Sequence, residues 1–169
     1  LIRGKRNIAA VVAHTHWDRA WCQPFEQFRL SLCKVVKRLL HVLEHDPRFC
    51  VFTFDGQSVV IEDYLELYPE DRPRIERLVR AGRITVGPFY VLPDFFLVTG
   101  ESIIRNGLIG QRLAAKFGRA SRQGYVADPF GLPAQLPQLF AGMGLESVFF
   151  SRGISREQLA QAGSTFRWQ

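Results

Sequence analysis

Short apolar runs alternate with longer amphipathic segments along the chain, and this alternation limits the possible folds more than any other feature. Five runs rich in Val, Ile, Phe and Tyr are predicted to be strands, at residues 8–13, 50–54, 83–86, 124–127 and 147–150. Patterns typical of helices cover residues 26–44, 61–67, 74–80, 102–117, 135–143 and 156–162. Strands that are apolar on both faces need cover on both sides. The sequence therefore predicts an α/β fold with a parallel sheet.

Composition narrows the class of protein further. The 169 residues are 47% hydrophobic, which suits one globular unit spanning residues 1–169. The formal charge of +6 comes from Lys and Arg spread along helical segments, so we predict no nucleic-acid site. No apolar run reaches the roughly 18 residues that a membrane span needs. Cys22, Cys33 and Cys50 show no CxxC spacing, which favours free thiols in a reducing compartment, and we predict a cytoplasmic protein.

Both ends of the sequence look cut. The chain starts on LIRGKRN without Met and ends on STFRWQ, so we expect a fragment of a longer protein.

Polar or charged residues follow each predicted strand at its carboxyl end. The five exits carry His14 to Asp18, Asp55 to Gln57, Asp94, Asp128, and Ser151 with Arg152. In parallel α/β sheets and barrels these ends gather at one mouth, where sites are built. Loops are polar in general. A functional site nevertheless explains a His-x-His-x-Asp pattern after an apolar strand better than loop polarity does.

In an extended segment the side chains of His14, His16 and Asp18 can face one cavity, because alternate residues project to the same side. Imidazole and carboxylate groups are good ligands for zinc. The spacing fits a metal site and a hydrogen-bonded histidine pair equally well, and it does not choose between the histidines. A metal site needs a ligand from elsewhere. Asp128 is the best candidate, although alone it also fits a turn or a helix cap.

Several motifs together resemble one enzyme family. HTHWDRAW, FTFDGQSVVIEDYLELYPE, LVTGESIIRNGLIGQR and ADPFGLPAQLPQLFAGMG occur in this order and spacing. They are similar to the amino-terminal catalytic region of glycoside hydrolase family 38, the zinc-dependent retaining α-mannosidases, above all the bacterial members. The resemblance covers nearly all of the chain. It implies a β/α barrel-like domain, seven-stranded in the family, of which this chain supplies about the first half.

The resemblance also implies roles for single residues. His16, Asp18 and Asp128 correspond to zinc ligands, and Asp128 also to the catalytic nucleophile. Trp21 corresponds to part of the sugar-binding floor, Phe130 to a pocket aromatic, and Arg152 to an arginine that contacts the nucleophile. The fourth ligand, a histidine, and the general acid, an aspartate, are expected beyond residue 169. The implied substrate is a mannose-containing oligosaccharide.

Three positions depart from the family pattern: Ala20, Phe95 and Leu132 stand where Glu, Glu and His are common. Two alternatives to a mannosidase follow from the sequence. A metal-dependent polysaccharide deacetylase could use a His-x-x-x-His pair such as His41 and His45, although both lie on an amphipathic helix and are predicted to face solvent. The second alternative is a non-catalytic carbohydrate-binding derivative of the enzyme. Asp128 and Arg152 argue against it, while the three departures and the expected truncation argue for it.

Overall fold

A computed structural model describes residues 11–168. Its first sheet consists of β1 (Ala13–His14), β2 (Phe52–Thr53) and β3 (Ile84–Thr85), in that order and all parallel. A second sheet pairs β4 (Gln123–Val126) with β5 (Ser147–Phe150), also in parallel. The predicted α/β class with parallel sheets is therefore confirmed.

The helices follow the predicted order, with boundaries shifted by a few residues. They are α1 (Phe25–His45), α2 (Val59–Leu65), α3 (Arg72–Arg80), α4 (Gly100–Phe117), α5 (Leu136–Gly142) and α6 (Arg156–Ala162), and the 3-10 turn η1 (Pro69–Asp71) precedes α3. In α1 the buried residues form one stripe that includes Leu32, Val36, Leu39 and Leu43, as the helical spacing requires. None of the helices that the structure describes combines the length and apolar character needed to cross a bilayer.

The first strand is shorter and more exposed than its apolar sequence predicts. β1 contains only Ala13 and His14, and residues 8–10 of the predicted strand lie outside the described range. Val11 is 92% exposed and Val12 is 60% exposed, so two-sided burial is wrong for this segment. Among the described residues β1 forms backbone pairing only with β2, at the edge of its three-stranded sheet.

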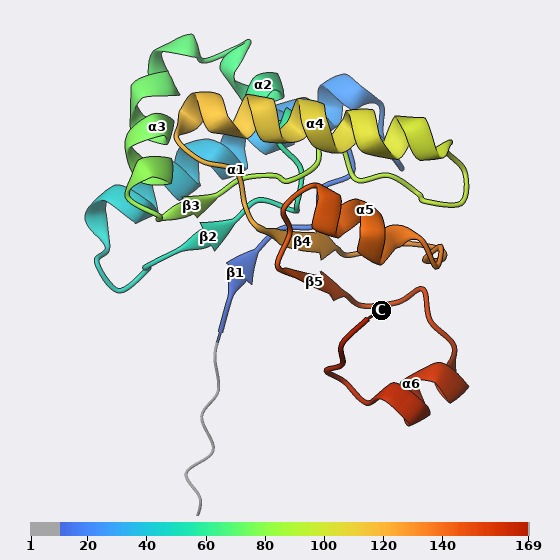
Figure 1. Ribbon diagram of the computed structural model, residues 1–169. Helices are drawn as coiled ribbons and strands as arrows, with labels where there is room; N and C mark the ends of the chain where they lie inside the picture. The colour runs from blue at the N-terminus through green and yellow to red at the C-terminus, as the bar shows by residue number, and fades with distance from the viewer. Residues whose placement is uncertain (1–10, 169) are drawn as a thin grey trace, which may run out of the picture.

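Two hydrophobic clusters form the core. In Figure 1, α1, α2, α3 and α4 lie on one side of β1–β3, and the larger cluster fills the space between these helices and the strands. The smaller cluster packs β4 and β5 against α5 and includes Phe89, Phe95, Val126, Leu136 and Phe140. Helix α4 contributes to both clusters, so it joins the two sheets.

Candidate active site

The pairing of β1 with β2 places His16 beside Asp55. His14 is opposite Thr53, and continuing the same register by two residues brings His16 level with Asp55. His16 Nδ1 lies 3.2 Å from Asp55 Oδ1. When Nδ1 carries the ring proton and donates it to this carboxylate, Nε2 is left with a free lone pair.

The free side of the His16 ring faces two further carboxylates. Nε2 lies 3.7 Å from Asp18 Oδ1 and 3.9 Å from Asp128 Oδ2. The structure therefore brings together His16, Asp18 and Asp128, which were predicted from separate segments. They come from the exits of β1 and β4, which belong to different sheets.

The second sheet positions Asp128 and Arg152 in the same way. Val126 is opposite Phe150 in the β4–β5 register, so the residues two positions later, Asp128 and Arg152, also lie level. Arg152 Nη2 forms an ion pair with Asp128 Oδ1. The Arg152 guanidinium also lies over the Phe130 ring, 4.9 Å from its centroid.

His14 is directed away from this group. Its Nδ1 lies 2.8 Å from the hydroxyl oxygen of Tyr125, a residue of β4, and the two rings contact each other with centroids 5.4 Å apart. His16 and Asp18 therefore lie close to each other, whereas the His14 ring turns toward β4.

The donor chemistry of the three residues fits zinc. Donor atoms around a tetrahedral zinc with bonds of about 2.0–2.2 Å are about 3.3–3.6 Å apart, close to the two distances measured from His16 Nε2. Within residues 11–168, however, no three His, Cys, Asp or Glu side chains are placed so that they could hold a metal ion as they stand.

Asp55 is a residue of this site that the sequence analysis did not assign. Its side chain is 0% exposed, and its Oδ2 accepts hydrogen bonds from the Trp17 backbone N–H (2.5 Å) and from Gln57 Nε2 (2.8 Å). Burial raises the pKa of Asp55, while the Trp17 N–H and His16 oppose that rise. The sequence placed Asp55 at a predicted strand exit, but its equal offset with His16 from the paired strands appears only with the strand bounds of the structure.

Trp21 stands apart from the cluster. It is 81% exposed, in the bend that precedes α1. Across residues 11–168, no hydrogen bond, ion pair or ring contact joins its side chain to the cluster formed by His16, Asp18 and Asp128. Phe130 is also exposed, and it is linked to the cluster through Arg152.

The three departures from the family pattern have different structural settings. Phe95 is 2% exposed and packs against Phe89 and Phe140, with ring centroids 6.2 and 6.0 Å away, so it belongs to the core. Leu132 is half-buried against the same cluster, whereas Ala20 is exposed. Phe95 therefore fills volume that a carboxylate could not occupy without a partner.

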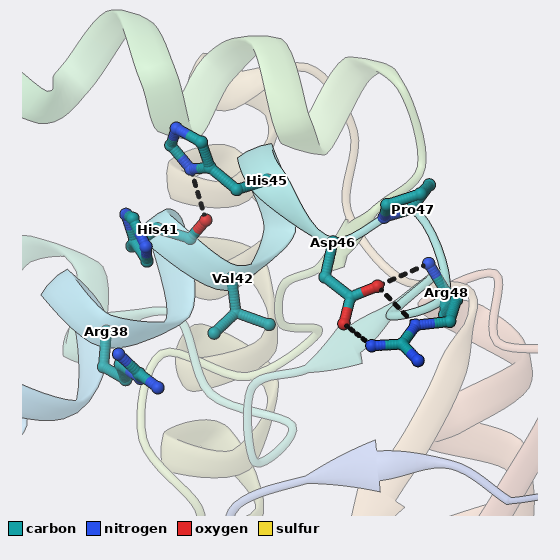
Figure 2. A pocket seen from close by; sticks show the side chains of 7 residues that line it. All are labelled: Arg38, His41, Val42, His45, Asp46, Pro47 and Arg48. Atoms are coloured by element: carbon teal, nitrogen blue, oxygen red, sulfur yellow. Dashed lines mark hydrogen bonds and ion pairs between the residues drawn. The ribbon is translucent and has the colours of Figure 1, made fainter.

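The histidine pair on α1 lies at the opposite edge of the sheet. His41 and His45 are exposed, as predicted, and their rings stack with centroids 4.3 Å apart. Figure 2 shows them with Arg38 and Arg48 around an open depression at the end of α1, where the chain turns toward the start of β2. The candidate site lies at the other ends of the strands, so this pair cannot complete it.

A parallel α/β unit with its carboxylates at the strand exits belongs to the class of folds whose enzymes place their active sites at those ends. Comparison with known proteins then shows the family. The model of the glycosyl hydrolases family 38 N-terminal domain matches residues 6–169, and the chain belongs to this family.

Relatives agree with this assignment. The chain is 38% identical to a putative mannosylglycerate hydrolase of Halalkalibacterium halodurans over 89% of this chain and 17% of that protein. It is 34% identical to alpha-mannosidase G of Dictyostelium discoideum over 94% of this chain and 14% of that protein. The crystal structure of an alpha-mannosidase from Enterococcus faecalis superimposes with a TM-score of 0.83 at 40% identity, covering 85% of this chain and 16% of that one. The chain thus spans less than a fifth of these relatives.

Proposed function

We propose that this chain carries part of the active site of a zinc-dependent retaining α-mannosidase, with Asp128 as nucleophile and His16, Asp18 and Asp128 as zinc ligands. The observation that supports this most strongly is the position of the His16 Nε2 atom, 3.7 Å from Asp18 and 3.9 Å from Asp128. These are the donor types that zinc selects, and they come from exits of both sheets.

Retaining hydrolysis needs a carboxylate nucleophile and a second carboxyl group about 5 Å away. In the first step an Asp128 oxygen forms a bond to the anomeric carbon. The bond to the leaving oxygen breaks, and that oxygen takes a proton from the acid. In the second step water attacks the same carbon, gives its proton to the second carboxyl group and frees Asp128. The second carboxyl group and a fourth ligand, a histidine, are expected outside residues 1–169.

Bound zinc would supply positive charge next to Asp128 and binding sites for sugar hydroxyls. The residues of this chain would hold the nucleophile in place and contact the sugar. Arg152 holds the Asp128 carboxylate by its ion pair, and its own position is fixed by stacking on Phe130. Asp128 Oδ1 pairs with Arg152 and Oδ2 faces His16, so the two oxygens can divide the nucleophile and ligand roles. Trp21 and Phe130 offer exposed aromatic faces for the pyranose ring.

The wider setting follows from the family. We infer that residues 1–169 form one unit, about the first half of a seven-stranded barrel-like domain, in a cytoplasmic enzyme. One relative is named for mannosylglycerate and others for α-mannosides, so the proposal fixes mannose as the sugar on the cleaved bond. A polysaccharide deacetylase is disfavoured because His41 and His45 lie at the wrong edge of the sheet. A non-catalytic derivative is disfavoured because Asp128 and Arg152 remain paired.

The nucleophile assignment is tested by trapping the glycosyl-enzyme. A fluoro-mannoside that reacts quickly and is released slowly should label the full-length protein on the peptide that contains Asp128. The Asp128→Asn variant should lose label and turnover of an aryl α-mannoside by about 1,000-fold or more. Because Asp128 is also a proposed ligand, lost turnover alone does not identify the nucleophile. A label on any other carboxylate would refute this assignment.

A further inference from the structure

Asp55 is the most deeply buried acidic residue near the candidate site, and no basic side chain of Arg or Lys is paired with it among the described residues. A buried carboxylate is costly unless its oxygens receive hydrogen bonds. Its donors are the Trp17 N–H, Gln57 and the His16 ring, and two of the three belong to the 16–17 segment. Asp55 therefore binds the segment that carries His16, which lies 38 to 39 residues earlier in the sequence.

Gln57 supports the same segment from a second position. Its Nε2 donates to the Trp17 carbonyl oxygen at 2.7 Å and to Asp55 Oδ2 at 2.8 Å. Gln57 thus holds the backbone of Trp17, whereas Asp55 is the residue that contacts the His16 ring. This division makes it possible to separate anchoring of the segment from orientation of the ring.

We infer that Asp55 is a positioning residue that fixes the His16 ring with its proton on Nδ1 and so leaves Nε2 as the atom available to a metal. The inference rests on the proposed function, because it concerns the proposed ligand His16. Histidines that bind metals commonly donate their other ring N–H to a carboxylate, which fixes the tautomer and the ring orientation. The geometry matches: Nδ1 is 3.2 Å from Asp55, and Nε2 faces Asp18 and Asp128.

Asp55 also explains why the two neighbouring histidines differ. His14 contacts the Tyr125 hydroxyl and the Thr15 carbonyl oxygen through the same ring nitrogen, Nδ1, and has no carboxylate beside it in the described part of the chain. Of the two histidines, only His16 lies level with a buried acidic residue, Asp55, which follows β2. The strand register therefore selects the ligand that the His-x-His spacing leaves undecided.

The test is the Asp55→Asn variant of the full-length protein, freed of metal and titrated with Co²⁺. The asparagine oxygen can still accept from the Trp17 N–H, but its NH₂ group would donate to His16 Nδ1 and force the ring proton onto Nε2. We expect Co²⁺ affinity to fall by about 10- to 100-fold and the visible absorption of bound Co²⁺ to change, with the protein still folded. Gln57→Leu is the matched control. It should lower stability but keep Co²⁺ affinity and the spectrum near those of the wild type.

The outcomes separate the two proposals. Wild-type Co²⁺ binding in Asp55→Asn would overturn the role of Asp55 alone, as would a Gln57→Leu variant that loses as much affinity as Asp55→Asn. His16→Ala provides the reference for the metal site itself. If the wild-type protein binds Co²⁺ no more tightly than His16→Ala, both the role of Asp55 and the proposed zinc site are wrong.

Discussion

At the scale of single residues, two histidines only two positions apart have different surroundings. The His14 ring contacts Tyr125 at the junction of the two sheets, and the His16 ring lies between Asp55 on one side and Asp18 and Asp128 on the other. A histidine whose partner is a neutral hydroxyl serves packing and hydrogen bonding. A histidine between carboxylates is suited to bind a cation.

This contrast gives a prediction for a matched pair of variants. His16→Ala should reduce the zinc content of the purified full-length protein to a small fraction of the wild-type value, because it removes a proposed ligand. His14→Ala should retain zinc and instead lower the free energy of unfolding by about 1 kcal/mol, through loss of the Tyr125 contact. Metal analysis and denaturant unfolding of both variants provide the check. Equal zinc loss in the two variants would contradict the assignment.

The predictability of the site also varies from residue to residue. Polar residues at strand exits made His14, His16, Asp18 and Asp128 candidates, and the family resemblance selected His16, Asp18 and Asp128 among them. Asp55 could not be assigned in the same way, since an Asp-Gly pair after a strand is what an ordinary turn contains. Its importance depends on the β1–β2 register, which a sequence does not show. In the sequence, Phe95 stands out only because the family commonly has Glu at this position. In the structure its surroundings are those of a core residue.

At the scale of elements, arginine and glutamate side chains join helices α1 and α3. Glu44, near the end of α1, accepts hydrogen bonds from Arg74 Nε (3.1 Å) and Nη2 (2.5 Å) and from Arg77 Nη2 (2.5 Å). The Arg74 hydrogen bonds hold the pKa of Glu44 below its usual value, although partial burial acts in the opposite direction. A carboxylate with a lowered pKa stabilises the folded state above its unfolded pKa, and this contribution is lost as the pH falls through the folded value.

Glu44→Gln should therefore lower the free energy of unfolding by about 1 kcal/mol at pH 7. The difference from the wild type should shrink below a pH of about 4.3, where the glutamate becomes protonated in the unfolded chain and then in the folded one. Urea unfolding at pH 7, 5 and 3 measures this. Glu101→Gln is the control: Glu101 pairs with Arg105 on the surface of α4, and its loss should change little at any pH. A pH-independent effect of Glu44→Gln would contradict the electrostatic explanation.

Element types could be predicted from the sequence, but the extents of the strands could not. All five strands and the six helices of the described region were expected from hydrophobic periodicity. The strands of the first sheet are only two residues long, much shorter than the apolar runs that predict them. Periodicity reports which residues are apolar. It does not report where pairing with a neighbour stops.

At the scale of the whole molecule, α4 holds the two core clusters together. Asn106 accepts the Tyr90 and Val91 N–H groups through its side-chain oxygen, at 3.0 and 2.9 Å, and its Nδ2 donates to the Val91 carbonyl oxygen at 2.7 Å. One turn later, Gly110 lies against the backbone of Phe89 and Tyr90. The helix and the segment after β3 therefore approach backbone to backbone.

The sequence predicts α4 as an amphipathic helix but does not predict this close approach. Glycine within a helix lowers helix propensity, so Gly110 alone would be a weak position for a helix. The reason for a glycine at position 110 appears only when the helix is docked on the Phe89–Tyr90 backbone. The arrangement of two short sheets around one helix therefore depends on long-range packing that periodicity does not encode.

The last prediction concerns this contact. Gly110→Ala should lower the free energy of unfolding by about 2–4 kcal/mol, because the added Cβ would overlap backbone atoms of Phe89 and Tyr90 that cannot move independently. Gly142→Ala in α5 is the matched control, since no atom lies within 4 Å of the position of its Cβ. That variant should be neutral or more stable by about 0.5 kcal/mol, because alanine favours the helix. Both are measured by denaturant unfolding. Similar stabilities for the two variants would show that α4 does not require this approach to join the two sheets.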